Sequence, residues 1–317
     1  MLQHIRPFCF WAQHLDAINQ ERLPDFLHAN RSTVEGIVQT CQRQRKHWDR
    51  DAQELLRNES ELLLQSFRNT QPTSGRESVE RRLDAIIQTQ ATEIMELPGL
   101  ALSFKVFLVN QLERVNRQTG AYVAWARKID ALLCSTPEAQ VYELASGGGG
   151  FCRHLLKSHD KAHALRVTGS DYDQDFVDLA QAKCRANDSQ LRFENRDATQ
   201  LWDIHDVDLF VCAQAAHHMN AGDIVAMIHT ALRAKQGILI IDLLRSLTGA
   251  LEAACAVALL SPLTPVFWDG FQSVRRGFLP SELTLLATLA GAQNIVTEPL
   301  GPVHFSLHAK GQAEAAF

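Results

Sequence analysis

The 317-residue sequence lacks the features that mark several common protein classes. Its seven cysteines, at positions 9, 41, 134, 152, 184, 212 and 255, are scattered and never form a Cys-x-x-Cys pair. Disulfide frameworks and structural zinc sites need paired cysteine spacing, so this pattern argues against both. The sequence predicts no metal site.

Positive charge is also scarce, since 31 Lys and Arg face 36 Asp and Glu for a net charge of −5. A protein that mainly binds nucleic-acid phosphates needs a basic surface, so we do not expect a nucleic-acid partner. The most apolar segment, 250–268, contains Glu252 and is interrupted by Pro262 and Pro265, so it does not predict a membrane span. The sequence opens without a basic region followed by an apolar stretch, and a cytoplasmic protein is expected.

Strand signals are almost absent from the first 133 residues, where apolar residues repeat at helical spacing over 55–67 and 83–94. A cluster of turn-forming residues at 70–75 predicts a linker between helices. A long helical stretch follows Pro98 and reaches about Leu133, with a bend expected at Gly120. We therefore expect a helical extension over 1–75 and a helical region over 76–133 that caps a substrate site.

From residue 139 onward, short apolar runs alternate with helical segments, which is typical of parallel strands joined by crossover helices. The expected strands are 140–144, 165–170, 191–195, 207–212 and 237–242, with helices near 150–158, 174–186 and 222–234. A loop-rich insert over 245–280 precedes a helix with Ser281 as its N-cap, and strands at 293–298 and 303–308 form an antiparallel hairpin. The prediction is an α/β fold, with one domain over 134–317 after an all-helical N-terminal region.

The most informative stretch runs from Val141 to Gly150, where an acidic residue near a strand end precedes four consecutive glycines that lead into a helix. Glycines are needed where the backbone turns tightly and lets a ligand approach the main chain. The dinucleotide fingerprint GxGxxG fails here, because its third glycine would fall on Cys152. A phosphate-binding Walker loop fails as well, because no Gly-Lys-Ser/Thr follows.

The stretch Glu143-x-Ala145-x-Gly147-x-Gly149 instead resembles the E/D-x-G-x-G-x-G loop of class I methyltransferases that use S-adenosylmethionine. The resemblance covers roughly residues 100–317 and implies a seven-stranded, Rossmann-like sheet, mostly parallel with a C-terminal antiparallel hairpin. Ala145 departs from the pattern, because alanine disfavours a positive φ where the family has glycine. We expect this replacement to be tolerated if φ at Ala145 is negative.

The same resemblance assigns further residues to cofactor binding. Asp171 matches the acidic residue that holds both ribose hydroxyls, and a carboxylate suits a vicinal diol because it accepts two O–H groups. Tyr172 would lie along the adenine or ribose, and Asp197 with Ala198 would bind the adenine. The complete expected set is Glu143, Ala145, Ser146, Gly147, Gly149, Asp171, Tyr172, Asp197, Ala198, Ala213 and Gln214.

The catalytic candidates follow the fourth and fifth expected strands. Ala216-His217-His218-Met219 resembles a motif of the ubiquinone-biosynthesis and sugar O-methyltransferase groups, and Asp242 matches the aspartate that ends strand five in the latter. The resemblance implies His218 as the base, with Asp242 orienting it or a substrate hydroxyl. His217 is the other candidate base, and catalysis by proximity alone stays open. Arg245 fits either an acidic substrate group or a salt bridge.

The predicted function is therefore methyl transfer from S-adenosylmethionine to a small-molecule acceptor, most readily to a hydroxyl oxygen. Two alternatives remain open at this point. One is a protein or RNA methyltransferase that recognises its substrate through residues 1–75, with the basic run 43–46 as a contact. The other is a scaffold that binds the cofactor without catalysis, which the departure at Ala145 keeps open.

Overall fold

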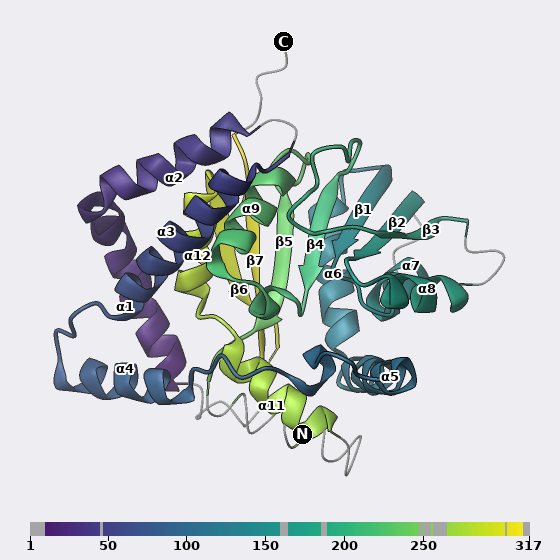
Figure 1. Cartoon of the computed structure of the whole chain (residues 1–317), viewed down its shortest axis with the longest axis horizontal. Coiled ribbons are helices and arrows are strands. Elements are labelled where there is room, and N and C mark those ends of the chain that lie inside the picture. Colours follow the sequence, from purple (N-terminus) through teal and green to yellow (C-terminus); the bar gives the residue numbers. More distant parts are fainter. Residues whose placement is uncertain are drawn as a thin grey trace.

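The computed structural model shows one seven-stranded sheet with helices on both faces (Figure 1). The residues it describes are 10–44, 47–158, 164–184, 189–246, 249, 255, 265–301 and 303–312. The strand order is β3-β2-β1-β4-β5-β7-β6. Strands β1 to β5 pair in parallel, whereas β7 is antiparallel to both β5 and β6. This confirms the predicted mostly parallel α/β sheet with its C-terminal antiparallel pair.

The strands follow the apolar runs of the sequence closely. Their bounds are β1 Glu138–Leu144, β2 Ala164–Asp171, β3 Leu191–Asn195, β4 Leu209–Ala213, β5 Ile238–Leu243, β6 Asn294–Pro299 and β7 His304–Lys310. Every residue of β5 is buried, because this strand has neighbours on both sides and helices on both faces. Central strands of this kind appear in sequence as continuous apolar runs rather than as alternating patterns.

Helices α7 (Gly150–Ser158), α8 (Gln174–Ala182) and α9 (Ala221–Ala231) form the predicted crossovers, and α12 (Pro280–Leu289) follows the insert. One buried apolar cluster lies on each face of the sheet. The first includes residues of α9 and α12, and the second includes residues of α7 and α8. The sheet therefore separates two cores while its carboxyl edge stays available for a site.

The described residues before β1 form helices and their connections, as predicted. The elements are α1 Phe10–Ala29, α2 Arg31–Arg43, α3 Arg50–Arg68, α4 Gly75–Ile87, the 3₁₀ turn η1 Ile94–Glu96, α5 Leu102–Gln118 and α6 Ala121–Leu133. Gly120 separates the last two helices with a φ of 78°, which confirms the expected bend. Helix α3 lies against α9 so closely that a Cβ at Gly222 would come 2.5 Å from the backbone nitrogen of Arg57. Among the described helices, none combines the length and apolar character needed to cross a membrane.

Three local predictions are wrong. The helical pattern over 83–94 breaks after Ile87, and Ile94 starts a separate 3₁₀ turn. The insert is not only loop, because α11 spans Val266–Arg276; of its earlier part, 247–248, 250–254 and 256–264 lie outside the described residues. Ser281 is not an N-cap: Leu279 precedes the helix, and its N–H donates to the Glu282 carboxylate at 3.0 Å.

Arg245 is fully buried and joins distant parts of the chain. Its guanidinium donates to Asp84 of α4 at 2.8 Å and to Glu282 of α12 at 2.7 Å, while Arg68 of α3 also bonds Glu282 at 2.7 Å. Of the two roles that the sequence left open for Arg245, the structure shows the salt bridge. The network ties the N-terminal helices to the C-terminal part of the sheet.

Candidate functional site

The glycine loop between β1 and α7 is held by the aspartate that ends β2. One carboxylate oxygen of Asp171 accepts the N–H of Gly147 at 2.9 Å, and the other accepts the N–H of Asp173 at 3.0 Å. Asp171 is buried, and this burial raises the pKa of its carboxyl group. The side chain therefore fixes the loop, and it also lines the cleft that opens at the carboxyl ends of the strands.

Two of the loop glycines are required for different reasons. Gly147 has a φ of 51°, in the left-handed region, with open space where a Cβ would be. Gly149 also has a positive φ, and a Cβ there would lie 2.4 Å from Cζ of Phe193 on β3. Gly149 thus lets the loop pack against the sheet and does not itself line the cleft.

Ala145 has a φ of 51°, so the negative φ that would make alanine favourable at this position is not present. A left-handed alanine is strained by roughly 1 kcal/mol or more. The strain lies at the cleft wall, where unusual backbone conformations concentrate in functional sites.

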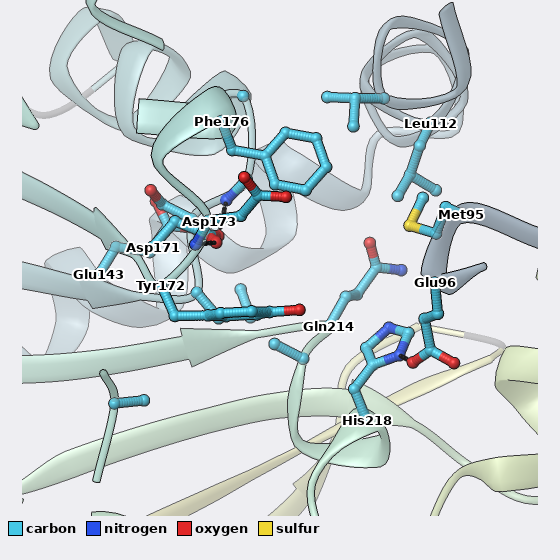
Figure 2. A pocket seen from close by; sticks show the side chains of 18 of the residues that line it. Met95, Glu96, Leu112, Glu143, Asp171, Tyr172, Asp173, Phe176, Gln214 and His218 are labelled. Carbon is cyan, nitrogen blue, oxygen red and sulfur yellow. Dashed lines mark hydrogen bonds and ion pairs between the residues drawn. The ribbon is translucent and has the colours of Figure 1, made fainter. Parts of the chain in front are cut away.

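A cleft of about 740 Å³ opens at the carboxyl ends of the parallel strands (Figure 2). It brings together every predicted cofactor residue except Gly149, which packs against Phe193 instead. Glu143 lies at its floor, where Sγ of Cys152 is 2.6 Å from the carboxylate, and burial raises the pKa of Glu143 to about 7. Tyr172 lies at the rim with 78% of its surface exposed, and Oδ1 of Asp197 accepts the N–H of Thr199 at 2.8 Å.

Gln214 stands between this cleft and a second cavity, and its φ of 54° is also left-handed. Its Oε1 accepts from Nδ2 of Asn116 on α5 at 2.6 Å, and its Nε2 lies 2.8 Å from Nε2 of His304 on β7. Burial lowers the pKa of His304 to about 4, so this imidazole is neutral near pH 7 and accepts the amide hydrogen of Gln214. The three side chains form a fixed polar partition.

The second cavity, of about 240 Å³, lies under α5, α6 and α11 and beside the start of β7. Most of its lining is apolar, as in ordinary small-molecule sites. It shares five lining residues with the larger cleft: Met95, Leu112, Asn116, Gln214 and His218. A molecule in the cavity would therefore meet a molecule in the cleft at this shared wall.

The two histidines have different carboxylate partners, and the predicted pairing of His218 with Asp242 is wrong. Asp242 accepts the backbone N–H of His217 at 2.8 Å and lies 2.6 Å from Nδ1 of the same residue. Burial alone would raise the pKa of Asp242, but the interaction with His217 outweighs it and lowers that pKa. Nε2 of His217 is buried without a hydrogen-bond partner among the described residues, 3.7 Å from Oε1 of Glu93.

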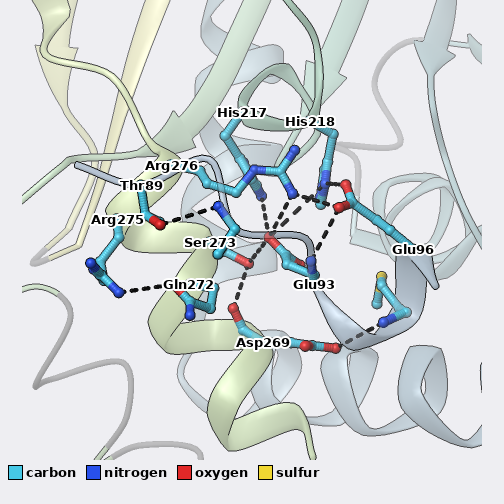
Figure 3. A network of polar contacts seen from close by, with 12 residues as sticks. Thr89, Glu93, Glu96, His217, His218, Asp269, Gln272, Ser273, Arg275 and Arg276 are labelled. Carbon is cyan, nitrogen blue, oxygen red and sulfur yellow. Dashed lines mark hydrogen bonds and ion pairs between the residues drawn. The ribbon is translucent and has the colours of Figure 1, made fainter. Parts of the chain in front are cut away.

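His218 turns instead toward η1, where its Nδ1 lies 2.5 Å from Oε1 of Glu96 (Figure 3). Arg276 of α11 donates to the other oxygen of Glu96 at 2.6 Å. Burial would raise the pKa of Glu96, but these two hydrogen bonds outweigh it and lower the pKa to about 2. Glu96 is thus a carboxylate at every physiological pH, and it fixes the orientation of the His218 ring.

Residues 141–236 match the family of the methyltransferase domain. This match covers the glycine loop, the aspartate that ends β2 and the histidine pair. The chain carries an S-adenosylmethionine-dependent methyltransferase domain.

Solved structures similar to this methyltransferase include the magnesium protoporphyrin IX methyltransferase of Synechocystis PCC 6803, with 18% identity over 64% of this chain and 94% of that chain and a TM-score of 0.43. Human N-acetylserotonin methyltransferase has 16% identity over 94% of this chain and 96% of its own chain, with a TM-score of 0.47. An O-methyltransferase from neocarzinostatin biosynthesis has 18% identity over 81% of this chain and 69% of its own chain, with a TM-score of 0.48. No curated protein matches the sequence.

Several residues at the methyltransferase site were not among the predicted ones: Glu93, Glu96, Asn116, Ser273, Arg276 and His304. Glu93 lies in the segment 83–94 that the periodicity assigned to a helix, and Glu96 lies just beyond its end. Their approach to the histidines depends on the fold and leaves no local signal.

Glu93, His217 and His218 offer ligand atoms within 4.8 Å of one another, which by distance would suit a metal ion. The carboxylate of this cluster is already engaged, however. Glu93 accepts from the Ser273 hydroxyl at 2.7 Å, and the Arg276 guanidinium lies 3.8 Å from the same oxygen. A metal ion at this oxygen would have to displace both contacts.

Proposed function

We propose that this methyltransferase acts on a hydroxyl oxygen of a small acceptor bound in the second cavity. The observation that carries the proposal is the shared wall between the cofactor-sized cleft and the smaller cavity, with His218 on it. When bound in the cleft, S-adenosylmethionine supplies an electrophilic methyl group on a sulfonium.

The cleft residues keep the roles that the resemblance implies. Each oxygen of Asp171 already accepts one backbone N–H, and a carboxylate oxygen has a second lone-pair direction for a ribose hydroxyl. Asp197 and Ala198 would bind the adenine, with Tyr172 along it. Ala213 and Gln214 would lie beside the methionine part.

The acceptor oxygen must lose its proton as it forms the new bond to carbon. We assign that proton to Nε2 of His218, because Nδ1 of the ring donates to the Glu96 carboxylate and so leaves Nε2 as the basic nitrogen. The O–CH₃ bond forms while the S–CH₃ bond breaks, and S-adenosylhomocysteine is the product. Glu96 stabilises the imidazolium that results. Asp242 orients His217 rather than the base.

The size of the second cavity supports a small acceptor over a protein or RNA substrate. About 240 Å³ beneath three helices accommodates a molecule of one or two rings. Of the basic run proposed as an RNA contact, Arg45 and Lys46 lie outside the described residues.

Cofactor binding is tested by thermal unfolding with S-adenosylhomocysteine. A ligand at 100 times its Kd stabilises the folded state by about 2.7 kcal/mol, which raises Tm by several degrees. We expect this shift for the native chain and for the control Asp175→Ala on the exposed start of α8, and its loss in Asp171→Ala. An absent shift in the native chain at millimolar ligand would refute cofactor binding.

The assignment of the base is tested with a labelled methyl donor and a panel of small phenols and alcohols. Loss of a general base typically lowers kcat by about 10²- to 10⁴-fold. We expect such a loss in His218→Asn, with an unchanged S-adenosylhomocysteine shift, and none in the exposed control His205→Asn. Treatment with EDTA should leave turnover unchanged. An active His218→Asn would show catalysis by proximity, and the absence of turnover with any acceptor would favour a cofactor-binding scaffold.

A further inference from the structure

The charged lining of the acceptor cavity is of one sign. Among the described residues that line it, Glu93 and Asp269 carry carboxylates, and no Lys or Arg contributes. Glu93 and Asp269 are both buried, with 2% and 4% of their surface exposed. A charge at this depth is screened by solvent far less than one at the surface.

The layer behind the lining does not reverse this sign. Asp242 lies against His217 and Glu96 against His218, and Arg276 donates to Glu96 at 2.6 Å and lies 3.8 Å from Oε1 of Glu93. With both histidines protonated, the four carboxylates Glu93, Glu96, Asp242 and Asp269 would still outnumber the three cations of this described group. With neutral histidines, Arg276 is the one cation among these described residues.

Residues 247–264, the part of the insert between the Arg245 network and α11, supply no compensating cation either. Residues 247–264 contain Glu252 and no Lys, Arg or His. The sequence therefore brings no positive charge from this segment, wherever it lies.

A buried anion beside an excess of carboxylates is strongly disfavoured, whereas an ammonium group gains an ion pair. Glu93 is the carboxylate placed to form that pair. The two oxygens of Asp269 accept the backbone N–H groups of Ile94 and Met95, at 2.7 and 3.2 Å. Burial raises the pKa of Glu93, and a bound ammonium would favour its ionised form.

We infer that the acceptor is a hydroxyl compound without an acid group, that an acceptor with an ammonium group is preferred, and that Glu93 determines this specificity. The inference rests on the proposed function, since it assumes that the acceptor occupies the second cavity. Specificity here comes from repulsion of the wrong ligand as much as from attraction of the right one.

Binding of three matched phenols to the full chain, saturated with S-adenosylhomocysteine, tests the inference by calorimetry without any need for turnover. The probes are 4-(2-aminoethyl)phenol, 4-ethylphenol and 3-(4-hydroxyphenyl)propionate, which share a ring and a hydroxyl and differ in charge. We expect the amine to bind at least 10-fold more tightly than the acid, with the neutral phenol between them.

The variant Glu93→Gln should reduce the ratio between amine and acid at least fivefold, whereas the exposed control Glu54→Gln on α3 should keep it. Equal binding of amine and acid, tighter binding of the acid, or an unchanged ratio in Glu93→Gln would overturn the inference. Failure of all three phenols to bind at millimolar concentration would overturn it too. Charge-selective binding without any methyl transfer would instead refute the proposed O-methylation and leave the specificity of the cavity standing.

Discussion

Two residues of the cleft wall, Ala145 and Gln214, adopt left-handed backbone conformations with φ of 51° and 54°. Each is strained because a Cβ disfavours this region. Both lie where a strand of the sheet gives way to the cleft, and both are held by neighbours: the N–H of Ser146 donates to Ser170 at 2.8 Å, and that of Gln214 to Ile241 at 2.7 Å. The surrounding sheet thus imposes a backbone shape that these residue types do not favour alone.

Relief of this strain is measurable at Ala145. In Ala145→Gly, the loss of Cβ strain exceeds the added entropy of the unfolded glycine, and we expect a stabilisation of about 0.5–1 kcal/mol. Gly147→Ala is the matched opposite change, because Gly147 has the same φ of 51° and open space where a Cβ would lie. This variant should be destabilised by a similar amount. Urea unfolding of both variants measures the two effects. A destabilised Ala145→Gly would show that the methyl group packs favourably enough to outweigh the strain.

The strands β1 and β7 place two buried titratable residues on either side of the site, and these residues respond to pH in opposite directions. Burial raises the pKa of Glu143 from 4.5 to about 7, so the folded state binds the extra proton over that range and loses stability as pH rises. Burial lowers the pKa of His304 from 6.5 to about 4, so the unfolded state binds the extra proton and stability is lost as pH falls. Each effect amounts to about 3 kcal/mol, and in the native chain they largely cancel.

Single substitutions should reveal each slope. In Glu143→Gln, stability relative to the native chain should increase between pH 4.5 and 7, because the unfavourable ionisation of Glu143 is gone. In His304→Asn, relative stability should decrease over the same range, because only the Glu143 effect remains. Urea unfolding at four pH values from 4.5 to 7.5 measures both profiles. Parallel profiles for the two variants would contradict these pKa directions.

The strands and the glycine loop were predictable from the sequence, because the local pattern of residues determines them. Continuous apolar runs such as the one in β5 have few alternatives to a buried strand, and the glycines of the loop report a backbone requirement directly. The histidine partners were not predictable, because His217 and His218 are adjacent in sequence and face different carboxylates. Asp242 comes from β5 and Glu96 from a turn more than a hundred residues earlier, and only the packed fold brings η1 to the carboxyl edge.

At the scale of the whole molecule, the N-terminal helices form part of one of the two cores of the sheet. Leu56, Leu63 and Phe67 of α3 belong to the same buried cluster as Ile228 of α9 and Ile240 of β5. The Arg245 network reinforces this junction with buried charges, whose separation would leave Glu282 unpaired at a cost of several kcal/mol. The division at residue 75 therefore marks a linker in the chain, and we propose that folding of the 134–317 region depends on the helices before it.

Two adjacent leucines of α3 test this dependence, since Leu63 is 5% exposed and Leu62 is 61% exposed. Truncation of a buried leucine costs about 2–5 kcal/mol, whereas an exposed position changes stability by about 0.5 kcal/mol or less. If the N-terminal helices share the core, Leu63→Ala should lower the single unfolding transition of the whole chain, and S-adenosylhomocysteine should still raise it; Leu62→Ala should leave the transition unchanged. Urea unfolding, monitored both by tryptophan fluorescence and by ligand binding, measures the transition of each variant. If Leu63→Ala unfolds the first helices in a separate early transition while the ligand still binds, residues 1–75 are an independent extension, and the dependence proposed here is wrong.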